Sequence, residues 1–421
     1  MKKKILMLGW EFPPLINGGL GIACYGIAKS LSQLAEVSMI IPKADPEFVM
    51  NNVELIGLNN SKAEELLKGK SLLDFKDFLD IEYVDSDILP YQQVKKETSS
   101  SKSPEFKYLD DLNFFKHEDI YGGDVLGKVM KFTNIAVNIA LTKEFDVIYA
   151  HDWMTFLAGI QIKELTGKPL VVHIHATEVD RSGPENKSVV YQIERKGFEC
   201  SDKIIAVSQF TSNLLQEHYE IPEDKIAVCH NGIEYVETYR KQRSNGEKLV
   251  LYLGRLTSQK GPEYFLETAL KVIEQVPEVR FVMAGTGDSL KTLIEEGAAR
   301  RIGSKFHFTG FLNQEKVKQL YAMADVYVMP SVSEPFGLSA LEAAQFGIPC
   351  VLSKQSGVSE VMPNALMADY WDTALMARHI VDLLRNNTLR EFVINTTKSD
   401  VENLSWDATA KKILKVFETL N

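Results

Sequence analysis

The sequence has few cysteines, no long apolar run and no excess of basic charge. Its four cysteines (Cys24, Cys200, Cys229 and Cys350) are scattered over 421 residues without a Cys-x-x-Cys pair. This argues against a disulfide framework and against a structural zinc site. No apolar stretch reaches the roughly 18 residues of a membrane span. With 47 basic and 57 acidic residues, the formal charge is −10, so we expect no nucleic-acid partner.

The beginning of the chain superficially resembles a signal peptide, because lysines at positions 2–4 precede the apolar segment Ile5–Leu8. The apolar segment breaks at Gly9, and Glu11 and two prolines follow, which is not the composition of a cleaved leader. We therefore expect a buried first strand, no membrane span and a cytoplasmic protein.

Length and hydrophobic patterning predict two α/β domains. The chain is long enough for two domains, and its 45% hydrophobic and 25% charged content is ordinary for a folded protein. Short apolar runs alternate with amphipathic stretches, as in parallel sheets covered by helices. The expected strands are Ile5–Leu8, Val37–Ile41, Val147–Ala150, Leu170–His173, Ile204–Val207, Leu249–Leu253, Arg280–Ala284, Phe306–Thr309, Val326–Met329 and Cys350–Ser353. This pattern predicts two Rossmann-like, doubly wound domains facing across a cleft.

A polar segment at residues 237–246 lacks apolar periodicity and is the best candidate for a linker. We therefore predict a first domain over residues 1–240 and a second domain over residues 247–404. Residues 405–421 are expected to contain a separate amphipathic helix, with Ser405 as its N-cap.

Two loops have the composition of anion-binding sites. Gly18 and Gly19 precede a probable helix, where backbone N–H groups can approach an anion, although a tight turn explains these glycines equally well. Arg255 and Lys260 follow the strand Leu249–Leu253, at the strand end where α/β sheets bind ligands. Two cations on one loop can hold a diphosphate. The alternative interpretation is a pair of solvated surface charges.

Two carboxylates mark the segment 334–342. Glu334 follows the strand Val326–Met329, and Glu342 lies eight residues later, about two helical turns along an otherwise apolar helix. A loop carboxylate at this place can hydrogen-bond the hydroxyls of a sugar, and a helix carboxylate can bind the two hydroxyls of a ribose. Helix capping would explain Glu334 but not Glu342.

The chain resembles retaining GT-B glycosyltransferases, specifically glycosyltransferase family 4, in an ordered set of features: Gly18-Gly19, Arg255 with Lys260, Glu334 with Glu342, and Ser405-Trp406. The similarity covers essentially the whole chain. It implies that the first domain binds the acceptor and the second domain binds a nucleotide-sugar donor, while the terminal helix crosses back to the first domain. The nucleotide sugar is a substrate, so no cofactor is expected.

The resemblance also implies roles by position. Arg255 and Lys260 would neutralise the leaving diphosphate, Glu334 would hold the donor sugar and His151 would contact that sugar. These four are the predicted catalytic residues. The predicted donor-binding residues are Gly18 and Gly19 near the phosphates, Glu342 at the ribose, and Gly285, Phe336, Gly337 and Leu338. On the acceptor side the predicted residues are His175, Glu178 and Arg181.

The same resemblance implies retention by front-face attack, in which the leaving phosphate helps to deprotonate the acceptor, so we name no protein nucleophile. His173 and His175 alternate in a way that could suggest zinc, yet no third ligand occurs at close spacing. The segment Asp85-Ser86-Asp87 mimics the DxD of metal-dependent transferases but lies in a poorly patterned acidic stretch. We therefore predict catalysis without a metal.

The related glycogen and starch synthases share the segments Glu11-Phe12-Pro13-Pro14 and His151-Asp152-Trp153. They carry a lysine two residues before the paired glycines, where this chain has Ile16, and many bacterial members lack the second glutamate, present here as Glu342. We predict transfer of glucose from ADP-glucose or UDP-glucose to a glucan or oligosaccharide.

Three alternative functions stay open. A family 4 mannosyltransferase or other glycosyltransferase could use a lipid or small-molecule acceptor. A GT-B nucleotide-sugar epimerase could bind the same donors, and so could an inactive nucleotide-sugar sensor. The poorly patterned residues 59–122, with a Ser- and Lys-rich stretch at 98–104, are interpreted either as a solvated insertion or as a loop that closes over the acceptor. The sequence makes no prediction of oligomeric state.

Overall fold

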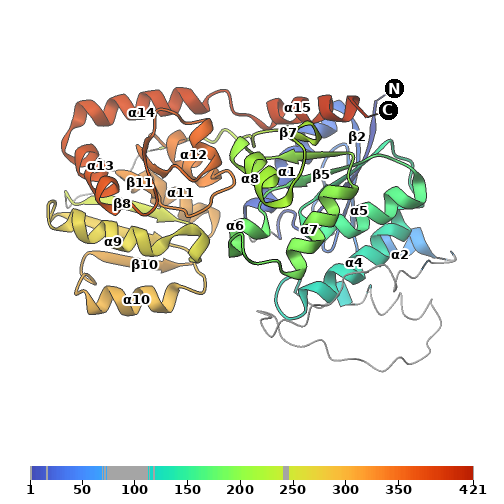
Figure 1. Cartoon of the computed structure of the whole chain (residues 1–421), viewed down its shortest axis with the longest axis horizontal. Coiled ribbons are helices and arrows are strands. Elements are labelled where there is room, and N and C mark those ends of the chain that lie inside the picture. The colour runs from blue at the N-terminus through green and yellow to red at the C-terminus, as the bar shows by residue number, and fades with distance from the viewer. Residues whose placement is uncertain are drawn as a thin grey trace.

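The computed structural model describes residues 2–15, 18–68, 70, 73, 112, 114–116, 119–239 and 246–420. Two parallel sheets lie side by side and are covered by helices (Figure 1). The expected pair of doubly wound α/β domains is therefore confirmed. Within the described residues, no helix combines the length and the apolar composition that crossing a membrane requires.

The first sheet has seven strands in the order β3-β2-β1-β4-β5-β6-β7, all paired in parallel. Its strands are β1 (Lys4–Leu8), β2 (Glu36–Ile41), β3 (Val53–Gly57), β4 (Val147–His151), β5 (Leu170–Ile174), β6 (Lys203–Ala206) and β7 (Ile226–Val228). Leu6 and Leu8 of β1 face one apolar cluster, whereas Ile5 and Met7 face another. Both faces of the sheet are buried, which explains why its central strands are continuous apolar runs.

Helices cover the two faces of this sheet. They are α1 (Gly19–Leu34), α2 (Ser61–Leu67), α4 (Val125–Ala140), α5 (Trp153–Thr166), α6 (Glu178–Ser182), α7 (Val189–Cys200) and α8 (Gln209–Tyr219), followed by a 3-10 turn, η1 (Glu223–Lys225). Helices α4, α5 and α7 contribute to the cluster that contains Leu6 and Leu8. Helix α1 lies on the opposite face.

The second sheet has six parallel strands in the order β10-β9-β8-β11-β12-β13. The strands are β8 (Lys248–Leu253), β9 (Val279–Ala284), β10 (Phe306–Gly310), β11 (Val326–Met329), β12 (Cys350–Ser353) and β13 (Leu366–Ala368). The helices are α9 (Pro262–Ile273), α10 (Leu290–Ala299), α11 (Gln314–Met323), α12 (Leu338–Gln345), α13 (Thr373–Arg385) and α14 (Asn387–Val401), with 3-10 turns η2 (Ser258–Lys260) and η3 (Gly357–Glu360). Two apolar clusters again lie on opposite faces.

The last helix, α15 (Trp406–Glu418), returns to the first domain and lies against α1 (Figure 1). Ser405 caps it, as predicted, because its hydroxyl oxygen accepts a hydrogen bond from the Ala408 N–H at 3.2 Å. The indole of Trp406 packs directly on Gly26, where even a methyl group would collide with the ring.

Direct contacts join the two domains. The Ser208 hydroxyl donates to the Pro335 carbonyl at 2.6 Å. The Glu360 carboxylate accepts hydrogen bonds from the N–H groups of Gln209 and Phe210, at 2.8 and 2.7 Å. These N–H groups begin α8, so a carboxylate of the second domain lies at the positive end of a helix of the first.

Three segments of the sequence interpretation are not among the described residues. Residues 240–245 of the predicted linker and the Asp85-Ser86-Asp87 segment lie outside the described residues, as does the stretch at 98–104. The predicted boundaries at residues 240, 247 and 404 therefore stay predictions. The structure shows that the chain passes from the first sheet to the second between β7 and β8.

Candidate active site

The order of strands reverses once in each sheet, and predicted site residues follow the strands at these reversals. In the first sheet the reversal lies between β1, which is followed by the loop with Gly18, and β4, which ends at His151. In the second sheet the reversal lies between β8, which is followed by the loop with Arg255, and β11, which is followed by the loop with Glu334. Such reversals are the usual ligand-binding places of open α/β sheets.

The loops at the carboxyl ends of the two sheets contact each other. Ser333 of the second domain donates a hydrogen bond to the carboxylate of Asp180 in the first, and α6 lies against η2. A Cβ placed on Gly19 would lie 3.8 Å from Leu338 Cδ1. Gly19 and Leu338, two predicted residues from different domains, are therefore brought close together.

Lys260 and Glu334 form a close ion pair in this region. Lys260 Nζ lies 2.9 Å from Glu334 Oε1 and 2.7 Å from Oε2, and the side chains are 19% and 10% exposed. Ser331 also donates to Glu334 Oε2, at 3.3 Å. The turn after Lys260 requires Gly261, because its φ is 60° and a side chain would collide with the Pro330 carbonyl. Two predicted catalytic residues are thus in direct contact.

The backbone of Glu334 is held on both sides. Its N–H donates to the Gln355 carbonyl at 3.0 Å, and its carbonyl accepts from the Gly357 N–H at 2.8 Å. The loop after β12 therefore fixes the position from which the carboxylate projects.

Glu342 projects from α12, the helix that begins just after the Glu334 loop. Its Oε2 accepts a hydrogen bond from the Tyr321 hydroxyl at 3.0 Å. Burial raises the pKa of Glu342, while the Tyr321 hydrogen bond and the charge of Lys318 oppose this rise. The carboxylate is held by a phenol rather than by a cation, and the assigned contact with a ribose stays a prediction.

Arg255 is exposed, and its loop packs on the loop after β9. The Leu256 N–H donates to the Thr286 carbonyl at 2.9 Å. Gly285 has φ 142°, and a Cβ there would collide with the Gly254 carbonyl. Gly285 is therefore required for this close packing of two loops, and its contact with a donor stays a prediction.

The remaining donor-side positions begin two helices. A Cβ on Gly18, just before α1, would meet no described atom within 4 Å, and no side chain caps this helix. Gly337, with φ 103°, is the N-cap of α12. The buried ring of Phe336 stacks on His230 of the first domain with centroids 5.9 Å apart. Phe336 thus packs the domain interface, and its contact with a donor stays a prediction.

Three imidazoles lie side by side at the ends of β4 and β5. His151 Nδ1 is 3.0 Å from His175 Nε2, and the His173 ring stacks on His175 with centroids 4.2 Å apart. Burial lowers the pKa of all three, to about 3 for His175, so they are neutral near pH 7. His151 has no exposed surface, whereas His175 is half-buried. Of the two predicted histidines, only His175 therefore has surface open to solvent, and the contact of either with a substrate stays a prediction.

Glu178 and Arg181 are engaged with each other and with α7. Arg181 Nε donates to Glu178 Oε2 at 3.0 Å, and Nη2 donates to Glu194 Oε1 at 2.6 Å. Burial raises the pKa of Glu194 to about 7, against the opposing charge of Arg181. These side chains fasten α6 to α7, and their role toward an acceptor stays a prediction. It is the neighbouring Asp180 that reaches the second domain.

An acidic group on the first domain received no role from the sequence. The Tyr121 hydroxyl donates to Glu11. Burial and the Glu11 charge raise the pKa of Tyr121, and Arg255 of the other domain opposes this rise. Burial raises the pKa of Asp152 to about 7, although the His175 N–H, which donates to it at 2.7 Å, favours the ionised form. Their positions after strands were the available signal, because Glu11 lies three residues after the end of β1 and Asp152 directly follows β4.

The sequence argument against a metal considered only ligands close together in the chain. The fold brings Cys24 of α1 to the histidines: one possible ligand atom each from Cys24, His151 and His175 lie within 4.8 Å of one another. The described residues thus contain a possible ligand set that spacing could not reveal, with His151 and Cys24 beside His175 and without His173.

Comparisons with known proteins agree with this geometry. A model of the family described as "Glycosyl transferases group 1" matches residues 236–400, and one described as "Glycosyltransferase Family 4" matches residues 107–236. An uncharacterized glycosyltransferase of Methanocaldococcus jannaschii is 30% identical over 438 residues, which cover 99% of this chain and 98% of that protein. The chain belongs to the GT-B glycosyltransferases.

Two further similarities are to a glycogen synthase in sequence and to a sucrose-phosphate synthase in fold. A glycogen synthase of Mycobacterium tuberculosis is 25% identical over 382 residues, 86% of this chain and 80% of that protein. The solved structure of a sucrose-phosphate synthase from Thermosynechococcus elongatus superposes with a TM-score of 0.71 at 17% identity, covering 99% of both chains. That likeness shows the shared fold.

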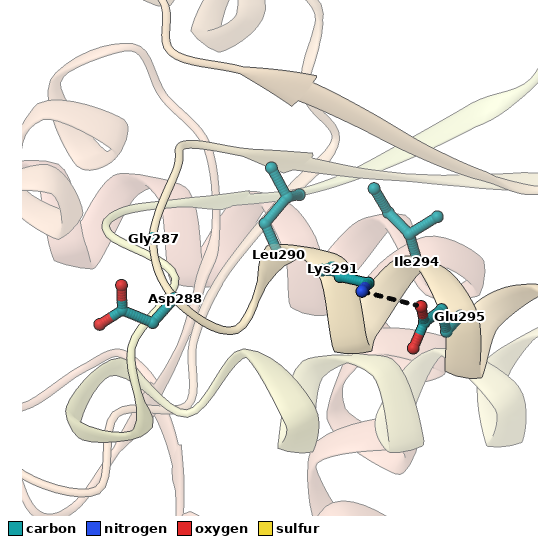
Figure 2. A pocket seen from close by; sticks show the side chains of 6 residues that line it. All are labelled: Gly287, Asp288, Leu290, Lys291, Ile294 and Glu295. Atoms are coloured by element: carbon teal, nitrogen blue, oxygen red, sulfur yellow. Dashed lines mark ion pairs between the residues drawn. The ribbon is translucent and has the colours of Figure 1, made fainter.

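An open cavity of about 480 Å³ lies beside α10 of the glycosyltransferase (Figure 2). Its lining residues are Gly287, Asp288, Leu290, Lys291, Ile294 and Glu295. The loop before α10 is bonded to the Arg255 loop, because the Ser289 N–H donates to the Leu256 carbonyl at 3.0 Å. None of the predicted site residues lines this cavity, and the predicted site around Lys260 and Glu334 stays a prediction.

Proposed function

We propose that this glycosyltransferase transfers glucose from ADP-glucose or UDP-glucose to a glucan or oligosaccharide, with retention and without a metal in the chemistry. The Lys260–Glu334 contact at the strand reversal, with Arg255 on the same loop, carries this proposal. The glycogen synthase of Mycobacterium tuberculosis supports a glucan acceptor.

The two cations match the charge that develops in the reaction. When the bond between the anomeric carbon and the diphosphate breaks, negative charge grows on the leaving phosphate. Lys260 and Arg255 would stabilise that charge where it forms, and Lys260 is already held in place by Glu334. Glu334 would accept hydrogen bonds from the sugar hydroxyls and so orient the anomeric carbon.

The residues suit front-face transfer. The acceptor hydroxyl approaches the anomeric carbon from the side of the leaving group. The bond to the phosphate oxygen breaks, the bond to the acceptor oxygen forms, and the acceptor proton passes to the leaving phosphate. The half-buried His175 is neutral at pH 7, and would donate or accept one hydrogen bond to a sugar hydroxyl.

Nucleotide release from ADP-glucose, UDP-glucose, UDP-GlcNAc and GDP-mannose, each with and without maltooligosaccharide, tests the proposal. We expect glucan-dependent release from one glucose donor, and loss of release in Lys260→Ala. Lys291→Ala is the matched control, because Lys291 is 87% exposed on α10 and outside the site. Nucleotide release that does not depend on maltooligosaccharide would contradict the proposed glucan or oligosaccharide acceptor. A new nucleotide sugar seen by NMR without an acceptor would indicate an epimerase instead.

A further inference from the structure

The cluster of Cys24, His151 and His175 has polar atoms that the rest of the protein does not satisfy. Within the described part of the chain, His151 Nε2 and His175 Nδ1 are buried without a hydrogen-bond partner. His151 and Cys24 have no exposed surface. The two unpartnered atoms are the outer nitrogens of two rings whose inner nitrogens, His151 Nδ1 and His175 Nε2, face each other, so a single cation would join Cys24 to the inner pair rather than to the unpartnered atoms.

The three side chains have the chemistry of a site for zinc or another thiophilic cation. In tetrahedral zinc sites the metal lies about 2.3 Å from sulfur and about 2.0 Å from nitrogen, so ligand atoms lie about 3.3–3.6 Å apart. Here the ligand atoms all lie within 4.8 Å of one another, and the facing nitrogens of the two histidines are 3.0 Å apart. A cation bound here would replace the hydrogen bond between these two nitrogens, and the Cys24 sulfur would move toward them.

Two of the three proposed ligands are buried, and the third is partly open to solvent. Cys24 lies on α1 within an apolar cluster, and His151 ends β4 with its ring centroid 4.3 Å from that of Tyr149, a member of the same cluster. His175 is half-buried and lies after β5. A cation can therefore reach the cluster from the side of the active site, past His175.

We propose that Cys24, His151 and His175 form a binding site for Zn²⁺ or a similar thiophilic divalent cation. Both imidazoles bind through a nitrogen lone pair, the Cys24 thiol loses its proton to solvent, and water takes the fourth position. A cation there occupies His151, which is predicted to contact the donor sugar, and His175, which is predicted to lie on the acceptor side. Bound zinc would therefore inhibit the transferase, an effect that rests on the proposed function, whereas the binding itself does not.

Cobalt(II) absorbance tests the site without reference to activity. Titration of the full chain with CoCl₂ under anaerobic conditions is expected to give a thiolate-to-cobalt charge-transfer band that saturates at one equivalent. Cys24→Ser is expected to lose this band and to weaken binding by about 10- to 100-fold. Cys229→Ser is the matched control, because Cys229 is buried in the same core but lies outside the cluster.

Each outcome is decisive. No band in the wild type, or an equal band in Cys24→Ser, would overturn the proposal, and loss in Cys229→Ser would place the cobalt elsewhere. Should Cys24→Ser lack native circular dichroism, His175→Ala tests the same cluster from its open side. Inhibition of nucleotide release by Zn²⁺ that a chelator reverses, and that Cys24→Ser reduces at least tenfold, would support the inhibitory role. Cobalt binding without inhibition would support the site and overturn that role.

Discussion

Replacing Lys260 with methionine keeps an unbranched side chain, shorter by one atom, but leaves the Glu334 carboxylate without its cation. Exposed ion pairs stabilise a protein by at most about 1 kcal/mol, whereas breaking a buried pair costs about 3–5 kcal/mol. The two side chains are 19% and 10% exposed, so this pair lies between these cases. We therefore expect Lys260→Met to lower the free energy of unfolding by about 2 kcal/mol. The turnover number is expected to fall by about 10²–10³-fold, as for other groups that stabilise developing charge.

Urea unfolding and nucleotide release separate the two effects. The double variant Lys260→Met/Glu334→Gln removes the unpaired charge and is expected to regain about 1 kcal/mol over Lys260→Met, without regaining activity. The control is Lys354→Met, which breaks a more exposed pair with Asp369 (50% and 29% exposed), and should change stability by less than about 1 kcal/mol. Additive stability losses in the double variant, or normal turnover in Lys260→Met, would refute this reasoning.

Three further predictions concern packing and pH. Trp406→Ala should lower the free energy of unfolding by about 3 kcal/mol in urea titrations, because the indole is 8% exposed between α15 and α1. Gly26→Ala should cost about 1–3 kcal/mol through collision with that indole, whereas Gly303→Ala, with no atom within 4 Å, should not. The pKa of His175 is lowered to about 3 from the ordinary 6.5. The unfolded chain therefore binds its proton first, and stability should fall as pH drops from 6.5 toward 3. In thermal scans His175→Asn should show a shallower decline, and an unchanged slope would contradict this assignment.

The ten strands expected from the sequence all occur, each within one residue of its expected bounds. They were recognisable because apolar runs fill strands whose two faces are both covered. The strands β3, β7 and β13 were not expected. All three are at sheet edges, and β7 is only half-buried throughout. An edge strand buries less surface and so leaves a weaker apolar signal.

By itself the sequence determined the two parallel sheets, the cap of the last helix, and the chemical nature of the loops with Arg255, Lys260 and Glu334. These features depend on residues close together in the chain. Only the tertiary structure decided which of them meet. Lys260 and Glu334 are 74 positions apart, and they touch because β8 and β11 are neighbours at the reversal of strand order. The same kind of long-range placement engages Arg181 with Glu194 and brings Cys24 of α1 to the histidines. Such contacts depend on which strands and helices pack together. The spacing of residues within one segment of the sequence does not determine that packing.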